Sequence, residues 1–277
     1  MIYDINGNPL NACYSVDGNE LDKAYATDGT EIFSAAPVLP DEIVATVIES
    51  DLSTNGLACQ GGCCANGNWY MVTIKQDASE QYLYSYDLTT GIFALRGTYS
   101  TLGHANSLAF NSNTGEILVA TGTFEYGIAC ISAETYQISR YLMTGRRQER
   151  SEGFWSVCYN RNDGLLYSWS NSDHQIDAYD TNGNHVNTIP ISGYITHTTS
   201  QGMTTDGFYF YFVWSLPNYI DAHAMTGEFV KSIPLSVAGY AAAELEEIGY
   251  DWDGHFYGQQ YINSGHQRLI GVPLRAT

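Results

Sequence analysis

Five turn dipeptides at nearly regular intervals constrain this chain more than any other feature. They are Asn66-Gly67, Thr114-Gly115, Asp163-Gly164, Asp206-Gly207 and Asp253-Gly254, and successive members are 48, 49, 43 and 47 residues apart. Each lies between two runs rich in Tyr, Phe, Trp, Val and Ile, which favour strands. A period of about 40 to 50 residues is typical of a β-propeller blade, because one four-stranded sheet buries both faces only when neighbours stack on it.

A second set of turns follows in step with the first. Thr90-Gly91, Thr135-Tyr136, Asn182-Gly183 and Thr226-Gly227 are spaced by 45, 47 and 44 residues. The sequence therefore predicts an all-β protein with a five-bladed β-propeller. Apolar second strands are expected at 69–74, 116–121, 165–170, 208–215 and 255–261, and fourth strands at 93–99, 138–142, 186–191 and 229–235.

The fifth unit lacks a fourth strand of its own, because little chain follows the segment 268–272. The segment 42–49 is apolar and β-branched and precedes the first blade. We expect this N-terminal strand to pair with the last blade and close the ring, which would remove two exposed sheet edges. The alternative is a strand that belongs to the N-terminal part of the chain.

A different repeat, of eleven residues, occupies the N-terminus. Its copies begin at Tyr3, Tyr14 and Tyr25, and each has Asn-Gly or Asp-Gly at the third and fourth positions after the tyrosine. This pattern predicts tight β-hairpins. Such short units bury little surface, so we expect the hairpin module, 1–36, to dock on another structure. A short proline-containing linker then leads to the propeller, 41–277.

The charge of the chain excludes several classes of partner. With 11 Lys and Arg against 30 Asp and Glu, the formal net charge is −19. This charge argues against binding nucleic acid or anionic membranes. The sequence has no signal-peptide pattern and no run of about 18 apolar residues, so we expect synthesis in the cytoplasm and no membrane insertion.

The six cysteines do not match a disulfide framework or a metal site. Cys59, Cys63 and Cys64 lack a second pair at a standard interval, and the N-terminal Asp-Gly turns lack the alternating carboxylates of a calcium loop. We therefore expect buried thiols, no metal and no cofactor. Cys64 and Cys158 are expected on the innermost strands of different blades.

Loops that lead into the innermost strands of a propeller gather on one face around the central channel. The residues that we expect to bind a ligand there are His104, Asn106, Arg146, Arg147, Arg150, Phe154, Trp155 and Gln201. The arginines suit acidic groups, Phe154 and Trp155 suit stacking on sugar rings, and the remaining three suit hydroxyl groups. The alternatives are that the arginines pair with nearby glutamates and that Trp155 fills space between blades, as we expect Trp169 and Trp214 to do.

Glu152, Glu246 and Glu247 are the basis of an enzyme alternative. Glycoside hydrolysis needs two carboxylates that converge on one bond. Adjacent strand residues point to opposite faces, so we expect only one of Glu246 and Glu247 to face the channel. One glutamate with His104 and His197 would be a metal site instead, although such residues are also ordinary hydrogen-bond partners. The chain has no nucleophile elbow and no phosphate-binding glycine motif, so no catalytic residue is assigned.

Two segments of the chain have recognisable sequence patterns. The tyrosine repeats, which end in Asp-Gly-Thr-Glu-Ile-Phe at 28–33, resemble leader modules of phage and prophage tail-associated proteins of gut Firmicutes. The segment 103–111, Gly-His-Ala-Asn-Ser-Leu-Ala-Phe-Asn, with the strand 117–120, resembles a blade motif of uncharacterised bacterial and phage propellers. These resemblances imply a virion-associated protein that meets other virion proteins through its hairpin module and presents the propeller to a partner.

The function predicted from these features is non-catalytic recognition of a cell-surface glycan or protein through the propeller face. A homo-oligomer or several copies in a virion would raise a weak affinity through avidity. One alternative is a glycan-cleaving propeller that uses Glu152 with Glu246 or Glu247. The other is a rigid spacer without a ligand, since a fold does not determine a function.

Overall fold

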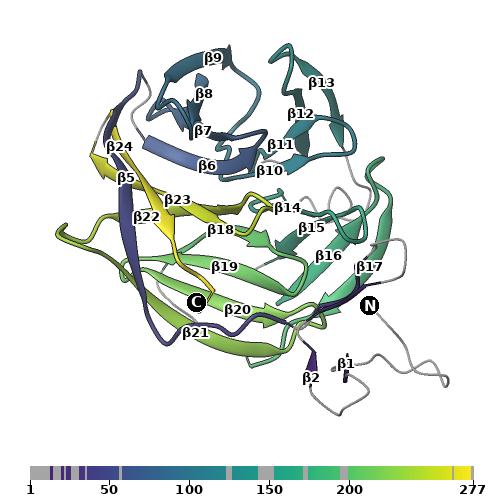
Figure 1. Cartoon of the computed structure of the whole chain (residues 1–277). Helices are drawn as coiled ribbons and strands as arrows, with labels where there is room; N and C mark the ends of the chain where they lie inside the picture. The colour runs from purple at the N-terminus through teal and green to yellow at the C-terminus, as the bar shows by residue number, and fades with distance from the viewer. Residues whose placement is uncertain are drawn as a thin grey trace. The chain divides into compact units, whose positions relative to one another are not determined.

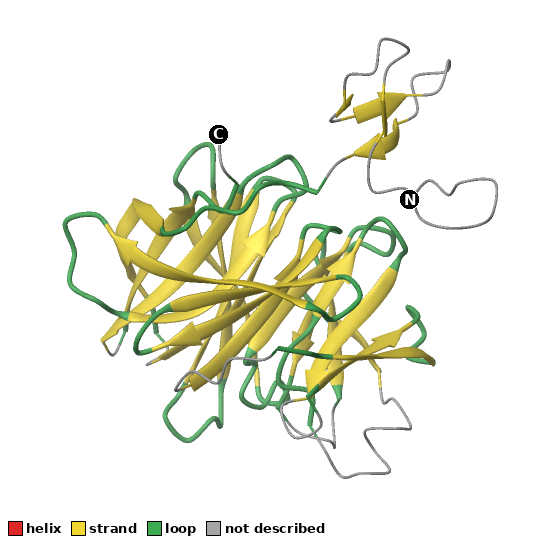
Figure 2. Cartoon of the chain, turned by 90° about the horizontal axis from the view of Figure 1, so that it is seen from below, coloured by secondary structure: helices red, strands yellow, loops and turns green. Residues whose placement is uncertain are grey.

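The computed structural model describes residues 13–14, 20–21, 23–25, 31–34, 36–55, 58–122, 127–142, 153–170, 174–193, 199–263 and 265–275. Contacts divide the chain into two units, Met1–Leu39 with Arg275–Thr277, and Pro40–Leu274. The described residues form strands and loops without a helix (Figure 2), so none of them lies in a helix that could span a bilayer.

The first unit contains two short antiparallel pairs. β1 (Cys13–Tyr14) pairs with β2 (Glu20–Leu21), and β3 (Lys23–Tyr25) pairs with β4 (Glu31–Ser34). Each pair flanks one of the predicted Asp-Gly turns. The turns themselves and the first copy of the repeat, apart from its last residue Cys13, lie outside the described residues.

The described part of the second unit contains three four-stranded antiparallel sheets (Figure 1). In each sheet, strands adjacent in sequence are adjacent in space. The first sheet is β6 (Ala58–Ala65), β7 (Asn68–Ile74), β8 (Gln81–Asp87) and β9 (Phe93–Tyr99). The second is β10 (Ser107–Asn111), β11 (Glu116–Ala120), β12 (Ile128–Ser132) and β13 (Ile138–Leu142). The third is β14 (Cys158–Asn160), β15 (Leu165–Ser170), β16 (Gln175–Tyr179) and β17 (His185–Pro190).

The remaining strands form one eight-stranded sheet, in the order β18-β19-β20-β21-β5-β24-β23-β22. One half is β18 (Thr199–Thr205), β19 (Tyr209–Ser215), β20 (Tyr219–Ala224) and β21 (Phe229–Val237). The other is β22 (Glu244–Tyr250), β23 (Phe256–Asn263), β24 (His266–Val272) and β5 (Ile43–Ser53).

Strand β5 joins the two halves of this sheet. It pairs antiparallel with β24, where Gly271 lies opposite Thr46, so the expected pairing of segment 42–49 with the last strand is present. It also pairs in parallel with β21, where Leu235 lies opposite Ile43. The second pairing was not predicted. It arises because β5 is 11 residues long, and its first three residues extend along β21 before the rest follows β24.

The first strands β6, β10, β14, β18 and β22 pack around a common centre, as Figure 1 shows. Strand β6 contacts β22 and β10, β14 contacts β10 and β18, and β18 contacts β22. Sheets arranged radially with their first strands innermost give a β-propeller architecture. Glycines allow these strands to approach: a Cβ on Gly61 would lie 2.5 Å from Cδ1 of Leu108 on β10.

The periodic turns have the backbone geometry that their sequences predict. Asn66 and Gly67 have φ values of 50° and 73°, and positive φ at both central residues defines the type I′ hairpin. Tyr136, in the second set of turns, has a φ of 57°. The predicted second and fourth strands all occur, with ends within two residues of those observed.

Aromatic side chains and thiols fill the space within and between sheets. Trp169 on β15 packs against Phe212 and Trp214 on β19, with ring centroids 4.9 and 5.6 Å apart. Both tryptophans are buried, which confirms their predicted packing role. The cysteines whose side chains are described are also buried and free, as predicted; they are Cys59, Cys63, Cys64, Cys130 and Cys158.

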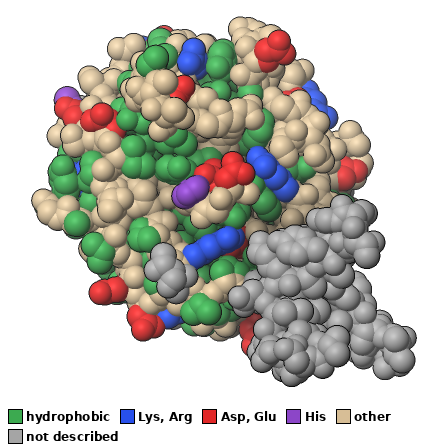
Figure 3. All heavy atoms as spheres, viewed as in Figure 1, with side chains coloured by type: hydrophobic (Ala, Val, Ile, Leu, Met, Phe, Trp, Pro, Cys, Tyr) green, Lys and Arg blue, Asp and Glu red, His purple; other side chains and the backbone are tan. Residues whose placement is uncertain are grey.

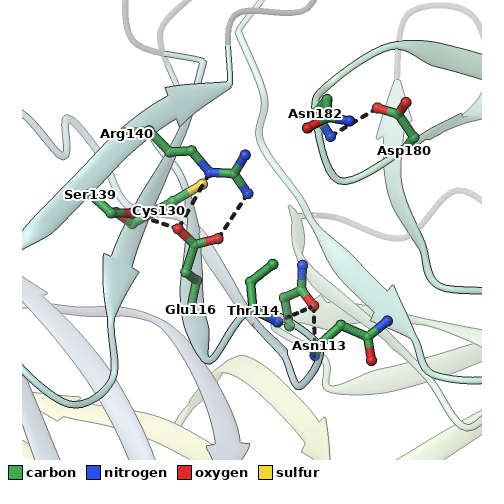
Figure 4. A network of polar contacts seen from close by, with 9 residues as sticks. Asn113, Thr114, Glu116, Cys130, Ser139, Arg140, Asp180 and Asn182 are labelled. Carbon is green, nitrogen blue, oxygen red and sulfur yellow. Dashed lines mark hydrogen bonds and ion pairs between the residues drawn. The ribbon is translucent and has the colours of Figure 1, made fainter.

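A partly buried ion pair crosses the second sheet (Figure 4). Nη2 of Arg140 on β13 lies 2.9 Å from Oε2 of Glu116 on β11, and the Ser139 hydroxyl donates to Oε1 of Glu116 at 2.6 Å. Burial acts to raise the pKa of Glu116, but hydrogen bonds from Arg140 and Ser139 outweigh it, and the pKa is lowered. Glu116 is therefore held as a carboxylate.

Candidate functional site

An exposed aromatic pair marks the face at which the first strands begin, which we call the upstream face. Trp155 lies in the loop before β14 and is 51% exposed. Its ring meets that of His104, in the loop before β10, edge to face, with the centroids 5.7 Å apart. Partial burial of the imidazole lowers the pKa of His104. A neutral imidazole and an indole therefore lie side by side at the surface.

Gly122 packs against both His104 and Trp155. It has a φ of 70°, a conformation that favours glycine. A Cβ at this position would lie 3.1 Å from Cβ of His104 and 3.2 Å from Cζ3 of Trp155. The Gly122 amide also donates to the carbonyl of Phe154 at 2.8 Å. A side chain at residue 122 would separate the two rings, so glycine sets their distance.

Asn106 fixes the loops beneath the aromatic pair. Its Nδ2 donates to the Trp155 carbonyl at 3.0 Å and to the Gln201 carbonyl at 3.3 Å. The side chain thus links the second, third and fourth groups of strands. Because Asn106 is 7% exposed and uses its amide in these bonds, it positions the face instead of contacting a ligand.

The hydrogen bonds continue from Gln201 across the fourth and fifth groups of strands. Nε2 of Gln201 donates to Oε1 of Glu244 at 3.0 Å and to Oγ of Ser215 at 3.2 Å. The carbonyl of Ala243, next to Glu244, accepts from Nε2 of Gln260 at 3.2 Å, and Nη1 of Arg268 donates to Oε1 of Gln260 at 2.9 Å. We call the chain Trp155, Asn106, Gln201, Glu244, Ala243, Gln260 and Arg268 the upstream belt.

The sequence-predicted ligand residues have different positions in the structure. His104 and Trp155 are exposed, whereas Asn106 and Gln201 are buried members of the belt. Phe154 is 1% exposed and packs edge to face on Tyr179 at 5.7 Å. It belongs to the core because the chain alternates sides between Phe154 and Trp155, so the expectation that Phe154 stacks on a ligand is corrected. Arg146, Arg147, Arg150 and Glu152 lie outside the described residues, as does His197.

Figure 3 shows the face at which the first strands end, opposite the upstream face, and most of its surface is uncharged. Acidic, basic and histidine side chains gather near its middle, with hydrophobic and uncharged polar groups around them. The excess of negative charge therefore does not form one continuous acidic patch on the described part of this face.

Two of the three glutamates of the enzyme alternative, Glu246 and Glu247, are among the described residues, and both are buried. Glu246 is 4% exposed and Glu247 is 0% exposed. The expectation that one of them faces away from the channel rests on strict alternation, and the structure breaks that alternation. A bulge in β22 places Leu245 opposite Gln260 but Glu247 opposite Gln259, and such an extra residue redirects side chains. Burial, and then the neighbouring Glu244, raise the pKa of Glu246.

The carboxyl group of Glu247 lies at the centre of the ring of first strands. It borders Gly202 on β18, where a Cβ would lie 2.0 Å from either of its oxygens, and it influences the titration of Cys63 on β6 and Cys158 on β14. Its Oε1 accepts from the amide of Ile248 at 3.1 Å.

Burial raises the pKa of Glu247 well above its ordinary value. Ser107 and the Leu108 amide, both on β10, oppose this rise, but Oε2 has no hydrogen bond of good geometry among the described residues. A neutral, enclosed carboxyl group of this kind serves packing and cannot reach a polysaccharide from solvent.

A small pocket lies between the first strands, toward the ends at which they finish. It is lined from all five first strands, including Cys63, Cys158, Leu108, Thr204 and Gly249. Burial raises the pKa of the Cys63 and Cys158 thiols, so they are poor nucleophiles and metal ligands. The described residues contain no group of three or more His, Cys, Asp or Glu side chains arranged to hold a metal ion.

Sequence reasoning missed three residues of the upstream face. They are Gly122, Tyr240 and Arg268. The signal for Arg268 was present, since it is the one Lys or Arg in β24 and apolar residues follow it there. Gly122 and Tyr240 had none, because their importance depends on neighbours that are distant in sequence.

Comparisons with known proteins yield general likenesses of fold. No protein-family model and no curated protein matches the chain. A structural genomics protein of unknown function from Bacteroides thetaiotaomicron has a TM-score of 0.49 at 11% identity, covering 88% of this chain and 80% of that one. A streptogramin B lyase has a TM-score of 0.46 at 16% identity, covering 76% and 65%. Regucalcin from Agrobacterium tumefaciens, a calcium-binding protein, has a TM-score of 0.48 at 12% identity, covering 84% and 97%. These values imply no shared activity.

Proposed function

We propose that this chain is a non-catalytic recognition protein whose propeller binds a cell-surface glycan or protein at the upstream face. The observation that carries the proposal is the half-exposed Trp155, held against His104 over Gly122. An indole exposed to solvent on fixed backbone offers a flat apolar surface for a sugar ring or an aromatic side chain. The hydrogen bonds of Asn106 hold that surface in place before a ligand arrives, which lowers the entropic cost of binding.

We also propose that the propeller has five blades. Five first strands meet at the centre, and each begins a group of four strands if the eight-stranded sheet is divided at β5. The fifth group then consists of β22, β23, β24 and β5, so its outer strand comes from the N-terminal side of the domain. The parallel contact of β5 with β21 is a link between the fourth and fifth blades.

The proposed setting is a phage or prophage virion. Its support is the resemblance of the tyrosine repeats to tail-associated leader modules, together with the separate N-terminal unit. In this setting the hairpin module attaches the chain to other virion proteins and the propeller contacts the host. Several copies in one particle would convert a weak single-site affinity into firm attachment.

The test is a glycan-array and whole-cell binding screen of the full chain, beside Trp155→Ala and His104→Ala. Trp252→Ala is the matched control, because Trp252 lies in the turn after β22, at the opposite end of the first strands. Binding that Trp155→Ala loses and Trp252→Ala keeps supports the proposal. Equal binding by all variants contradicts the site, and shortened glycans in the mixture would favour the hydrolase alternative with Glu152.

A further inference from the structure

Arg268 on β24 is a buried cation without a carboxylate partner among the described residues. It is 6% exposed, and its side chain makes one hydrogen bond to the described residues, from Nη1 to Oε1 of Gln260. Its Nε is enclosed and has no acceptor among those residues. Burying an unpaired charge is costly. The chain has 30 Asp and Glu, any of which could have formed an ion pair with Arg268 if the role of this arginine were structural. The missing counter-charge points to one supplied from outside.

The unused donors of Arg268 have a defined geometry. Nη1 is occupied by Gln260, so the free edge of the guanidinium is the one formed by Nε and Nη2. Two parallel N–H groups on one edge match the two oxygens of a planar carboxylate. Arg268 joins the upstream belt through Nη1, and the hydrogen bonds of the belt lead back to Trp155.

Tyr240 covers the guanidinium. Its ring centroid lies 4.2 Å from Cζ of Arg268, and the residue is 45% exposed. It is the one large side chain in the exposed segment 238–242, which reads Ala-Gly-Tyr-Ala-Ala. Because its neighbours are small, the loop makes few side-chain contacts that would break when the ring moves. Gly239, at a φ of 76°, gives the backbone conformational freedom next to Tyr240. Tyr240 therefore has the position of a lid.

We propose that Arg268 binds the carboxylate of an acidic sugar, with Tyr240 as the lid that moves aside to admit it. This inference rests on the proposed function and names its ligand class. In a complex, the Nε and Nη2 edge would hold the carboxylate while other sugar units of the same chain lie toward Trp155.

The experiment titrates the full chain with D-glucuronate, with its methyl ester and with glucuronate-containing oligosaccharides, by calorimetry and ligand-observed NMR. The wild type is expected to bind glucuronate. Its affinity for the neutral ester should be at least about tenfold lower, since a charged bidentate contact contributes more than about 1.4 kcal/mol. Arg268→Gln should remove this preference. Arg96→Gln is the matched control. Arg96 lies on β9 and, like Arg268, its side chain makes a hydrogen bond and a cation–π contact with a tyrosine ring.

Tyr240→Ala keeps the test valid if Arg268→Gln fails to fold, because the residue lies in an exposed loop. Its affinity for glucuronate should rise at least about twofold, since no ring has to be displaced; an unchanged or weaker affinity overturns the lid. Glucuronate and ester that bind equally to the wild type overturn the carboxylate site. Sulfate or phosphate that displaces glucuronate at equal concentration would overturn the assignment to carboxylates.

The two proposals fail in different ways. Neutral glycans bound through Trp155 without any effect of Arg268→Gln would leave the recognition function intact and overturn the acidic-sugar site. No binding of any glycan or cell by the wild type would overturn both.

Discussion

Gly202 lies directly against Glu247, and a Cβ on Gly202 would lie 2.0 Å from both carboxyl oxygens. The two residues come from β18 and β22, which are adjacent first strands. This contact lets a glutamate occupy the centre of the domain, and it makes the centre intolerant of added volume.

Gly202→Ala should destabilise the domain by about 2 to 3 kcal/mol, because the added methyl group overpacks the centre. Urea denaturation followed by circular dichroism measures the change. Gly271→Ala is the comparison and should cost less, since its tightest contact, 3.2 Å to Oγ1 of Thr46, needs a shift of only a few tenths of an ångström. In the Glu247→Ala background, Gly202→Ala should destabilise the domain less. An equal destabilisation in both backgrounds would show that the contact with Glu247 is not its cause.

Glu247→Gln should gain stability relative to the wild type as the pH rises. The folded-state pKa of Glu247 lies well above its unfolded value of about 4.5, so folding binds a proton. The stabilisation that depends on this proton is complete below the unfolded pKa and is lost as the pH rises toward the folded one. Free energies of unfolding at pH 5 and pH 8 test this. Glu42→Gln, at a surface position, serves as the control. If the free energies of unfolding of the wild type and Glu247→Gln differ by the same amount at pH 5 and pH 8, the explanation is wrong.

Arg140→Ala should cost about 1 to 2 kcal/mol, because Glu116 would keep its burial and lose its charged donor. The side chain of Arg140 is 35% exposed, so solvent screens part of the effect. Lys75→Ala removes an ion pair with Glu80 in which both side chains are 42% exposed, and it should cost under about 0.5 kcal/mol. Thermal and urea unfolding of both variants separate the two cases; equal losses would speak against a special role for Glu116.

Removal of residues 1–39 should leave the propeller folded, whereas removal of residues 1–53 should not. The longer deletion takes away β5, which pairs with both β21 and β24, and leaves two unpaired sheet edges. Size-exclusion chromatography and thermal melts of the two truncations measure the outcome. A monomeric, cooperatively melting protein without β5 would show that the ring does not need this strand.

Gly122→Ala should displace Trp155 without unfolding the domain. The substitution combines a positive φ with contacts of 3.1 Å to Cβ of His104 and 3.2 Å to Cζ3 of the Trp155 ring, a strain of about 1 to 2 kcal/mol. The Trp155 indole N–H signal in an NMR spectrum should shift and lose ligand response, while the signals of Trp169 and Trp214 remain. An unmoved Trp155 signal would show that residue 122 does not set the ring's position.

The strands and turns of this protein could be predicted from sequence because their signals are local. Asn66-Gly67 requires positive φ whatever surrounds it, and the runs on either side alternate or bury side chains with the period of a strand. The pairing of β5 with β24 could also be anticipated, because an apolar β-branched segment needs a partner and the last group of strands lacked one. The parallel contact of β5 with β21 could not, since it depends on how far the strand extends.

The upstream face was predicted in outline and only partly in its residues. Sequence placed His104, Asn106, Trp155 and Gln201 on one face, but not which of them would be exposed. Phe154 and Trp155 are equally plausible as aromatic contacts in the sequence, and the direction of one loop buries the first and exposes the second.

The sequence alone determined the repeat, the all-β class and the positions of the strands, because hydrophobic periodicity and turn chemistry act over a few residues. Only the tertiary structure decided that Glu247 is enclosed at the centre, that Gly122 spaces two rings and that Arg268 lies unpaired beneath Tyr240. The physical reason is distance along the chain: burial, charge pairing and close packing at these residues depend on partners contributed by other strands, whose approach is set by the assembled ring.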